Sequence, residues 1–261
     1  SSPSLNVSQT GLTLSAGTAT KLMMQTQGSG ALNAAAFTQQ PVVIITDADN
    51  NKVTSASGTI TASIGNGIGS KTANFGSTTT ASASSGQATF SGLTLTGGSD
   101  TYTITYTHSS YGTTSQSIAL GVGAATQLAI TTSADTAIVG ANFATQPVLE
   151  VRDSGGNRVT TSTASVAVTA TGATSVTLAG TTPVSAVNGV VTFAGLKLSG
   201  TPGAKTLSFT SNGLSGTSQS LELVLGTPTK LIIATAAAGA VNRTDFVTQP
   251  VVEIQDDYGN V

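Results

Sequence analysis

Apolar and polar residues alternate with a period of two along several short runs of the chain. Three of these runs follow a proline, and their alternate apolar positions are Val43 and Ile45, Leu149 and Val151, and Val252 and Ile254. Because successive side chains of a strand point to opposite faces of a sheet, this pattern predicts half-buried strands with these residues facing inward. The intervening residues are Ile44, Glu150 and Glu253, so we expect the opposite face to be exposed.

Further runs show the same alternation and are rich in Val, Ile and Thr, which favour strands. The expected strands are Leu22–Met24, Thr59–Ile64, Ala164–Thr169, Gln87–Leu95 and Val190–Leu198, with others around Ile104 and Tyr106, Leu207 and Phe209, Ile118 and Leu120, and Leu221 and Leu223. About seven strands per hundred residues, separated by Gly, Ser, Asn and Asp turns, are typical of an immunoglobulin-like β-sandwich.

One phrase occurs three times: Phe-x-x-Gln-Pro-Val, alternating apolar residues, and then Asp-x-x-x-Asn. It spans Phe37–Asn51, Phe143–Asn157 and Phe246–Asn260, and its prolines recur after 106 and 103 residues. This period is too long for a solenoid turn or a propeller blade and matches one sandwich of roughly 100 residues. The sequence therefore predicts an all-β chain of tandem immunoglobulin-like β-sandwich domains.

The repeat divides the chain into four expected parts. Residues 1–16 are assigned to the last strand of a preceding repeat, 17–122 and 123–225 to two complete repeats, and 226–261 to the first strands of an incomplete third repeat. The two ends are out of phase with the repeat. We interpret this as a segment of a longer array of repeats, rather than as donor-strand exchange in which the tail of one chain completes the head of another. The connections Leu120–Thr126 and Leu225–Thr229 are not flexible Ser/Gly tethers, so we expect the sandwiches to be arranged end to end with limited bending.

Composition narrows the possible partners. Charged residues make up 8% of the chain and the net charge is −2, which gives no electrostatic footprint for nucleic acid. No apolar run approaches the roughly 18 residues of a membrane span. The absence of cysteine excludes disulfides and thiolate metal sites.

The recurring turns also carry a family resemblance. Asp47–Asn51, Asp153–Asn157 and Asp256–Asn260 each follow a β-rich run, and the later Gly86–Phe90 and Asn188–Phe193 segments match one another. In these features the chain resembles bacterial immunoglobulin-like repeats, as found in invasin-type adhesins and other long surface proteins. The resemblance implies an extracellular location at a cell surface.

The acidic turns are the nearest approach to a metal site. Asp47, Asp49 and Asn50 could supply oxygen ligands for calcium, as could Asp256 and Asp257. The middle repeat offers only Asp153, and Asp and Asn also favour turns by bonding their own backbone. We therefore interpret these residues as structural turns and predict no metal site and no cofactor.

Catalytic residue types are scarce. The single histidine, His108, lies in a turn-like stretch and corresponds to Ser211 in the next repeat, so we expect a solvated turn residue. The glycine-rich segment Gly65–Gly69 lacks the following helix and lysine of a phosphate-binding loop, which favours a turn. With no cysteine nucleophile and no Gly-x-Ser-x-Gly motif, we expect no catalytic residues and no enzyme activity.

Covalent modification has weak support. Lys21 becomes Gln127 in the next repeat, and Glu150 is expected to face outward, so no intramolecular Lys–Asn cross-link is proposed. The sequons at Asn6–Ser8 and Asn242–Thr244 permit glycosylation, but such short motifs also arise by chance.

Two functions follow. The first is a structural repeat region of a microbial surface protein, as a stalk, filament or surface-layer component, with self-association or neighbouring repeats as its partners. The alternative is an adhesive module for a glycan or protein ligand on a host or matrix surface. An exposed patch of Tyr102, Tyr106 and Tyr111 would favour the alternative, although the second repeat has Lys205, Phe209 and Leu214 there.

Overall fold

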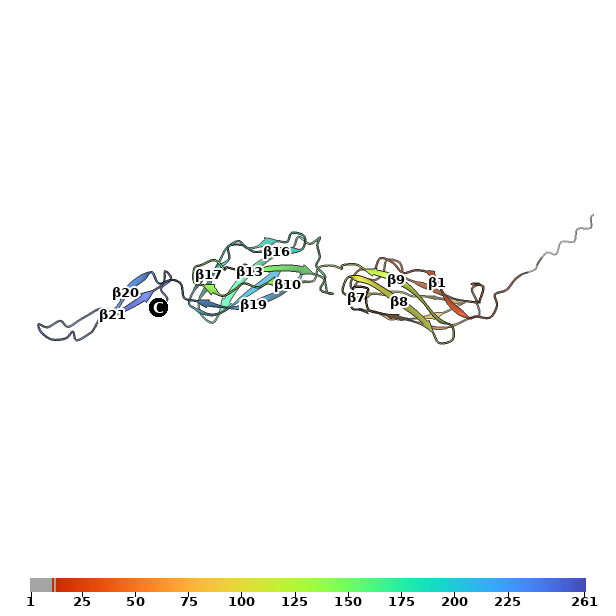
Figure 1. The fold of residues 1–261 in the computed structure, drawn as a ribbon, viewed down its shortest axis with the longest axis horizontal. Coiled ribbons are helices and arrows are strands. Elements are labelled where there is room, and N and C mark those ends of the chain that lie inside the picture. Colours follow the sequence, from red (N-terminus) through yellow and green to blue (C-terminus); the bar gives the residue numbers. More distant parts are fainter. Residues whose placement is uncertain (1–10, 12) are drawn as a thin grey trace, which may run out of the picture. The chain divides into compact units, whose positions relative to one another are not determined.

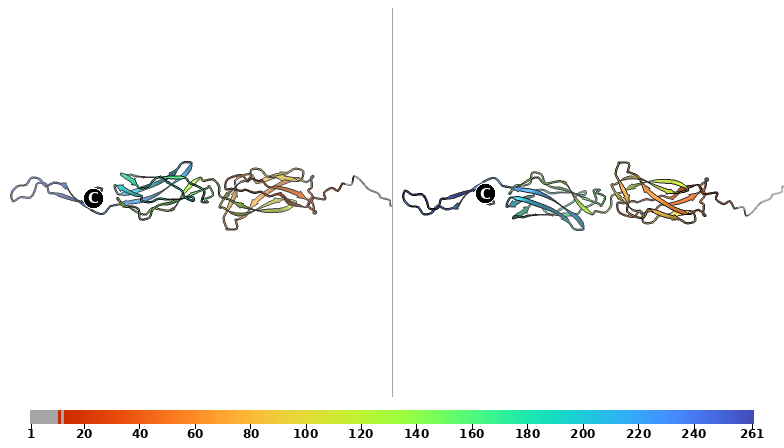
Figure 2. Two further views of the ribbon diagram at one scale, coloured as in Figure 1. Left: turned by 90° about the horizontal axis from the view of Figure 1, so that it is seen from above. Right: turned by 90° about the horizontal axis from the view of Figure 1, so that it is seen from below.

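The computed structural model describes residues 11 and 13–261, and no helix is present among them. These residues form two compact units that divide between Gly123 and Ala124, and each unit is described by itself (Figures 1 and 2). Both units consist of strands packed around an apolar core. The predicted all-β sandwich fold is confirmed.

The first unit contains two main sheets and a small one. The main sheets have the strand orders β1-β2-β6 and β5-β3-β8-β9, and β4 pairs with β7. The strands are β1 (Lys21–Thr26), β2 (Val42–Thr46), β3 (Gly58–Ile64), β4 (Ala73–Phe75), β5 (Thr80–Ala83), β6 (Gln87–Thr89), β7 (Leu95–Gly97), β8 (Asp100–His108) and β9 (Gly112–Leu120).

The second unit repeats this arrangement. The order β15-β13-β18-β19-β10-β12-β16 contains both halves of the sandwich, because the parallel pair Gln127 and Ser215 connects β10 to β19. The strands are β10 (Gln127–Thr132), β11 (Ala137–Ile138), β12 (Val148–Arg152), β13 (Ser165–Gly172), β14 (Val176–Ala179), β15 (Val184–Ser185), β16 (Val190–Thr192), β17 (Lys197–Gly200), β18 (Gly203–Ser211) and β19 (Leu214–Val224).

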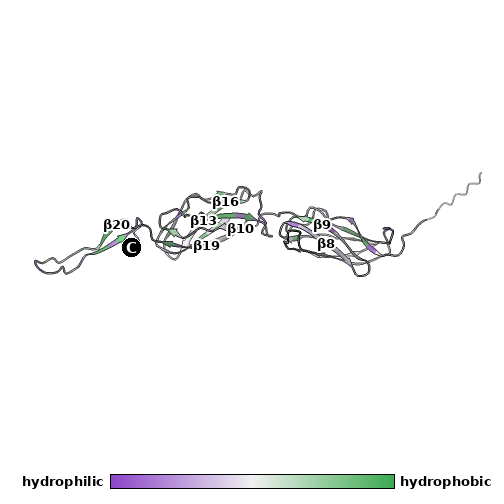
Figure 3. Cartoon of the chain, viewed as in Figure 1, coloured by the Kyte–Doolittle hydropathy of each residue, from purple (hydrophilic) through white to green (hydrophobic). Residues whose placement is uncertain are grey.

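The same unit also carries a two-stranded hairpin of β20 (Lys230–Thr235) and β21 (Val251–Gln255). Its register matches the β1–β2 and β10–β12 hairpins, including a bulge after the fourth residue of the first strand. The strands of this hairpin are largely apolar (Figure 3).

The predicted inward residues of β2 and β12 form the centre of each core. Val43, Ile45, Leu149 and Val151 are all fully buried. Equivalent aromatic pairs pack beside them, with ring centroids 5.2 Å apart for Phe90 and Tyr106 and 5.6 Å apart for Phe193 and Phe209. The alternation in the sequence therefore identified the core positions of both complete sandwiches.

Two expectations about these strands were wrong. Ile44 is buried, because its cross-strand neighbours Met23 and Gln87 place long side chains on the same face. The run Gln87–Leu95 is also not one strand. It changes sheets after Thr89, pairing first with β2 and then, as β7, with β4, and Gly92 in the left-handed region (φ 66°) lies in the crossing. The equivalent run Val190–Leu198 divides in the same way.

The N-terminal assignment stays a prediction. Residues 13–17 form no strand here, and residue 12 and the sequon at Asn6 lie outside the described residues. The division into four parts by the repeat is likewise a prediction from the sequence.

Tyr106 is fully buried, and its hydroxyl has no hydrogen-bond partner among the described residues. Burial also raises the pKa of this phenol. Because the second unit has Phe209 at the same place, we expect Tyr106→Phe to leave the unfolding free energy of the first unit unchanged or to raise it by up to about 1 kcal/mol. Phe209→Tyr is the reverse control and should lower the stability of the second unit. Urea unfolding measures both, and a clear loss of stability in Tyr106→Phe would contradict this account.

Candidate functional site

The three Asp-x-x-x-Asn turns share one hydrogen-bond pattern centred on the aspartate. Oδ1 of Asp47 accepts the backbone N–H groups of Asp49 and Asn51, at 3.0 and 2.9 Å. Asp153 accepts those of Gly155 and Asn157, and Asp256 those of Tyr258 and Asn260, at 2.9 to 3.0 Å. Each aspartate is buried and also accepts the side-chain amide of its asparagine. The motif is therefore a closed turn held by its own carboxylate.

The fourth residue of each turn explains why Asn or Gly stands there. Asn50, Gly156 and Gly259 all have positive φ angles, of 70°, 80° and 83°. Glycine adopts this left-handed conformation freely and asparagine tolerates it better than most residues. The sequence variation within the turns thus follows backbone geometry.

A third side chain supports the turns, and the sequence reasoning missed it. Lys21, Gln127 and Lys230 occupy the same position of the repeat. Their side chains donate to backbone carbonyls of the turns, at Ala48, Asp153 and Asp257, over 2.7 to 2.8 Å. The replacement of Lys21 by Gln127 preserved a donor, which was the signal available in the sequence.

The aspartate also connects its turn to a glycine 30 residues earlier in the chain. Oδ2 of Asp47 accepts the Gly17 N–H at 2.8 Å, and Oδ2 of Asp256 accepts the Gly226 N–H at 3.2 Å. The Gly17 N–H is the main cause of a lowered pKa of Asp47. Burial opposes ionisation of Asp256, but hydrogen bonds from Asn260, Tyr258 and Gly226 lower its pKa to about 2.

These contacts give the acidic residues a structural role. The oxygens of Asp47 and Asp256 face N–H donors, which a cation would have to displace. Asp257 accepts the Thr229 hydroxyl at 2.6 Å. Within residues 11 and 13–261, no group of three His, Cys, Asp or Glu side chains is placed to hold a metal ion.

The glutamine of the repeated phrase forms a second network. Gln40 donates to the Phe37 carbonyl at 3.1 Å, and its Oε1 accepts the Leu93 N–H at 3.0 Å. Gln146 makes the same contacts with Phe143 and Leu196, both at 3.0 Å. The glutamine therefore joins the loop before β2 or β12 to the segment that crosses between the sheets.

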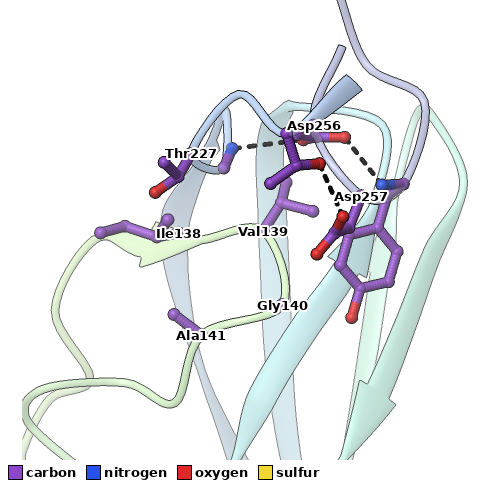
Figure 4. Close-up of a pocket in the computed structure, with 10 residues that line it drawn as sticks. Ile138, Val139, Gly140, Ala141, Thr227, Asp256 and Asp257 are labelled. Atoms are coloured by element: carbon purple, nitrogen blue, oxygen red, sulfur yellow. Dashed lines mark hydrogen bonds between the residues drawn. The ribbon is translucent and has the colours of Figure 1, made fainter. Parts of the chain in front are cut away.

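A small pocket lies beside the third turn. It has a volume of about 260 Å³, and Figure 4 shows it between Asp256 and the loop that carries Ile138–Ala141. This volume is below the range usual for small-molecule sites. The Tyr258 ring occupies the space that a side chain on Gly140 would need, with its Cε2 atom 2.4 Å from an added Cβ. The pocket is a packing feature of the turn.

His108 and the glycine-rich segment Gly65–Gly69 were the other candidates for a site. His108 is not a solvated turn residue, because it is buried at the end of β8. Its ring stacks on Tyr111 with centroids 4.4 Å apart, and its Nδ1 accepts the Ser110 N–H. Gly65–Gly69 lies in a loop, as expected, where the Gly69 N–H donates to the Asp100 carboxylate at 2.7 Å.

The tyrosine patch does not exist. Tyr102 and Tyr106 are buried in the core of the first unit, and only Tyr111 is partly exposed. Glu150, expected on the outer face of β12, is partly exposed and pairs with Arg152 at 2.8 Å and Arg158 at 3.6 Å. Asn242 of the second sequon is exposed.

Comparisons with known proteins give a distant structural likeness. No family model matches the sequence, and neither does any curated protein. Among solved structures, invasin, a bacterial integrin-binding protein, is 18% identical with a TM-score of 0.33, over 92% of this chain and 47% of invasin. A β-glycosidase from Bacteroides vulgatus is 10% identical with a TM-score of 0.34, over 77% of this chain and 24% of that enzyme.

The chain thus spans about a quarter to a half of the length of these proteins. At such scores the likeness carries no argument about activity or ligand, and the sandwich assignment rests on the strand pairing above. The part of the chain that the structure describes contains no helix long and apolar enough to cross a membrane.

Asp153 is fully buried and holds its turn through two backbone N–H groups and the Asn157 amide. We expect Asp153→Ala to lower the unfolding free energy of the second unit by roughly 2–4 kcal/mol, because these partly buried donors lose their acceptor. Thermal and urea unfolding measure the change. Asp49→Ala, at an exposed acid of the first turn, is the control and should change little. Equal effects of the two variants would contradict the structural role.

Asp256 gives a pH-dependent prediction. An aspartate in an unfolded chain titrates near pH 4. Because its folded-state pKa is about 2, the ionised carboxylate stabilises the turn above about pH 4, and this stabilisation is lost as the pH falls towards 2. We expect the backbone amide resonances of Gly226, Tyr258 and Asn260 to shift together with a midpoint near pH 2, and Asp256→Asn to lack this transition. A midpoint near 4 would show that these hydrogen bonds do not hold the carboxylate.

Proposed function

We propose that this chain is a structural repeat region of a microbial extracellular surface protein, acting in a stalk, filament or surface layer. The observation that carries the proposal is the use of the recurring residues. The Asp, Asn and Gln side chains of the repeated phrase bond to their own turns, to the glycine 30 residues earlier or to the segment that crosses between the sheets. A phrase repeated for ligand binding would instead present its polar groups to solvent.

The composition supports the same proposal. A chain with 8% charged residues and apolar strands of high β-propensity is suited to contacts with neighbouring repeats or with further copies of itself. We propose a non-catalytic role, with no bound cofactor. The adhesive alternative loses its tyrosine patch, because Tyr102 and Tyr106 lie in the core.

Three measurements test this proposal. An antibody against the chain should label intact cells of the source organism, and labelling only after permeabilisation would overturn the surface location. Regular fibres or sheets in electron micrographs, together with a negative glycan array, would support the structural role. Saturable binding to a glycan or a host matrix protein would favour the adhesive alternative.

A further inference from the structure

Three asparagines of the chain are followed directly by glycine, in the pairs Asn66–Gly67, Asn188–Gly189 and Asn212–Gly213. In such a pair the backbone nitrogen of the glycine can attack the side-chain amide carbon of the asparagine, because glycine has no Cβ to obstruct the approach. The attack also requires that this nitrogen is not engaged in another bond and that the backbone of the pair can rotate. The structure separates the three pairs on these two requirements.

The first pair is held by the fold. Gly67 is buried, and its N–H donates to the Lys71 carbonyl at 2.8 Å. The carboxylate of Asp100 fills the place that a Cβ on Gly67 would take. The attacking nitrogen is therefore engaged, and the loop cannot rotate without losing these contacts.

The second pair is fixed against the rest of its sandwich. The Gly189 carbonyl accepts the Val151 N–H at 2.9 Å, and the Val159 carbonyl fills the place that a Cβ on Gly189 would take. Val151 is a fully buried residue of β12. Because rotation of the Asn188–Gly189 turn would break its bond to this core strand, the turn is constrained.

The third pair meets both requirements. Asn212–Gly213 is the turn between β18 and β19, beyond the last strand pair of Ser211 and Leu214. Both turn residues are exposed, and no atom other than those of its chain neighbours lies within 4 Å of a Cβ added to Gly213. Neither the Asn212 side chain nor the Gly213 N–H forms a hydrogen bond with any described residue.

We propose that Asn212 is a site of spontaneous deamidation with isoaspartate formation, and that Asn66 and Asn188 are protected in the folded chain. The Gly213 nitrogen bonds to Cγ of Asn212 and loses its proton, while the side-chain amide leaves as ammonia and a succinimide ring remains. Water then adds to one of the two ring carbonyls and opens the ring, which gives aspartate or isoaspartate. No group is oxidised or reduced, and water is the only other reactant.

The isoaspartate product changes the turn. Its main chain runs through the former side chain, which lengthens the turn, and a negative charge appears at an exposed position. We expect the pair of Ser211 and Leu214 to be lost, while Phe209 stays buried in the core. The first unit has Ser109 at the place of Asn212, so its turn cannot react in this way. The proposal is independent of the protein's location and of its proposed function.

The test incubates the whole chain in mildly alkaline buffer prepared with H₂¹⁸O, followed by digestion in ordinary water and mass spectrometry of the peptides. Ring opening incorporates oxygen from the labelled water, so deamidation during digestion is excluded, and electron-transfer fragmentation identifies isoaspartate. We expect Asn212 to react about tenfold or more faster than Asn66 and Asn188, because those sites first need a local opening that costs at least about 1.4 kcal/mol.

Two controls accompany this measurement. In the chain unfolded with urea the three sites should react at similar rates, because the contacts that protect Asn66 and Asn188 are then absent. Asn212→Gln should remove most of the reaction at this turn and leave the unfolding free energy of the second unit unchanged.

Two results would overturn the proposal. One is an unlabelled Asn212 in the folded chain under conditions in which the urea-unfolded chain is labelled at all three sites. The other is labelling of Asn66 or Asn188 as fast as Asn212 in the folded chain, because the surroundings of each turn would then not control the reaction.

Discussion

The structure depends on the buried aspartate of each Asp-x-x-x-Asn turn, whose carboxylate accepts hydrogen bonds from backbone N–H groups that no neighbouring strand pairs with. After β2, β12 and β21 the chain leaves the sheet, and the N–H groups of the next few residues have no ladder partner. Asp47, Asp153 and Asp256 accept these groups within four residues of sequence. An unpaired buried N–H group costs about as much as a lost hydrogen bond, so the turn closes around its aspartate. In the two sandwiches the turn closes the short bridge that follows the strand, between Thr46 and Lys52 and between Arg152 and Arg158.

The glutamine of the repeated phrase forms long-range hydrogen bonds that complement the local bonds of the aspartate. The aspartate makes mainly local bonds, whereas Gln40 and Gln146 bond across 53 and 50 residues to the crossing segment. Gln116 and Gln219 make further long-range bonds, to Gly28 and Ala134, that join the first hairpin loop to β9 or β19. An amide side chain both donates and accepts, so one residue satisfies both backbone groups of an irregular segment. A low-charge sandwich can in this way hold its loops without salt bridges.

The sequence predicted the features that follow from period and local chemistry. Val43 and Ile45 alternate, and Asp and Asn favour turns, so the core strands and the turn were accessible without a structure. The burial of His108 was missed, although it continues the alternation of Ile104 and Tyr106 along β8, because turn-forming serines follow it directly. The change of sheet after Thr89 was also missed, since an apolar run continues through Leu93 and Leu95. The alternation of apolar residues shows that one face of a strand is buried, but it does not show to which sheet the strand belongs.

The β20–β21 hairpin shows which features of the fold depend on local contacts and which depend on strands distant in the sequence. Its turn is complete: Asp256 bonds to Tyr258 and Asn260, and Lys230 reaches the Asp257 carbonyl, as in the two sandwiches. Its apolar face is exposed all the same. The bonds of this turn close within a few residues and across one strand pair. Burial of the face requires strands that are distant in sequence, whose association carries a loop-closure cost.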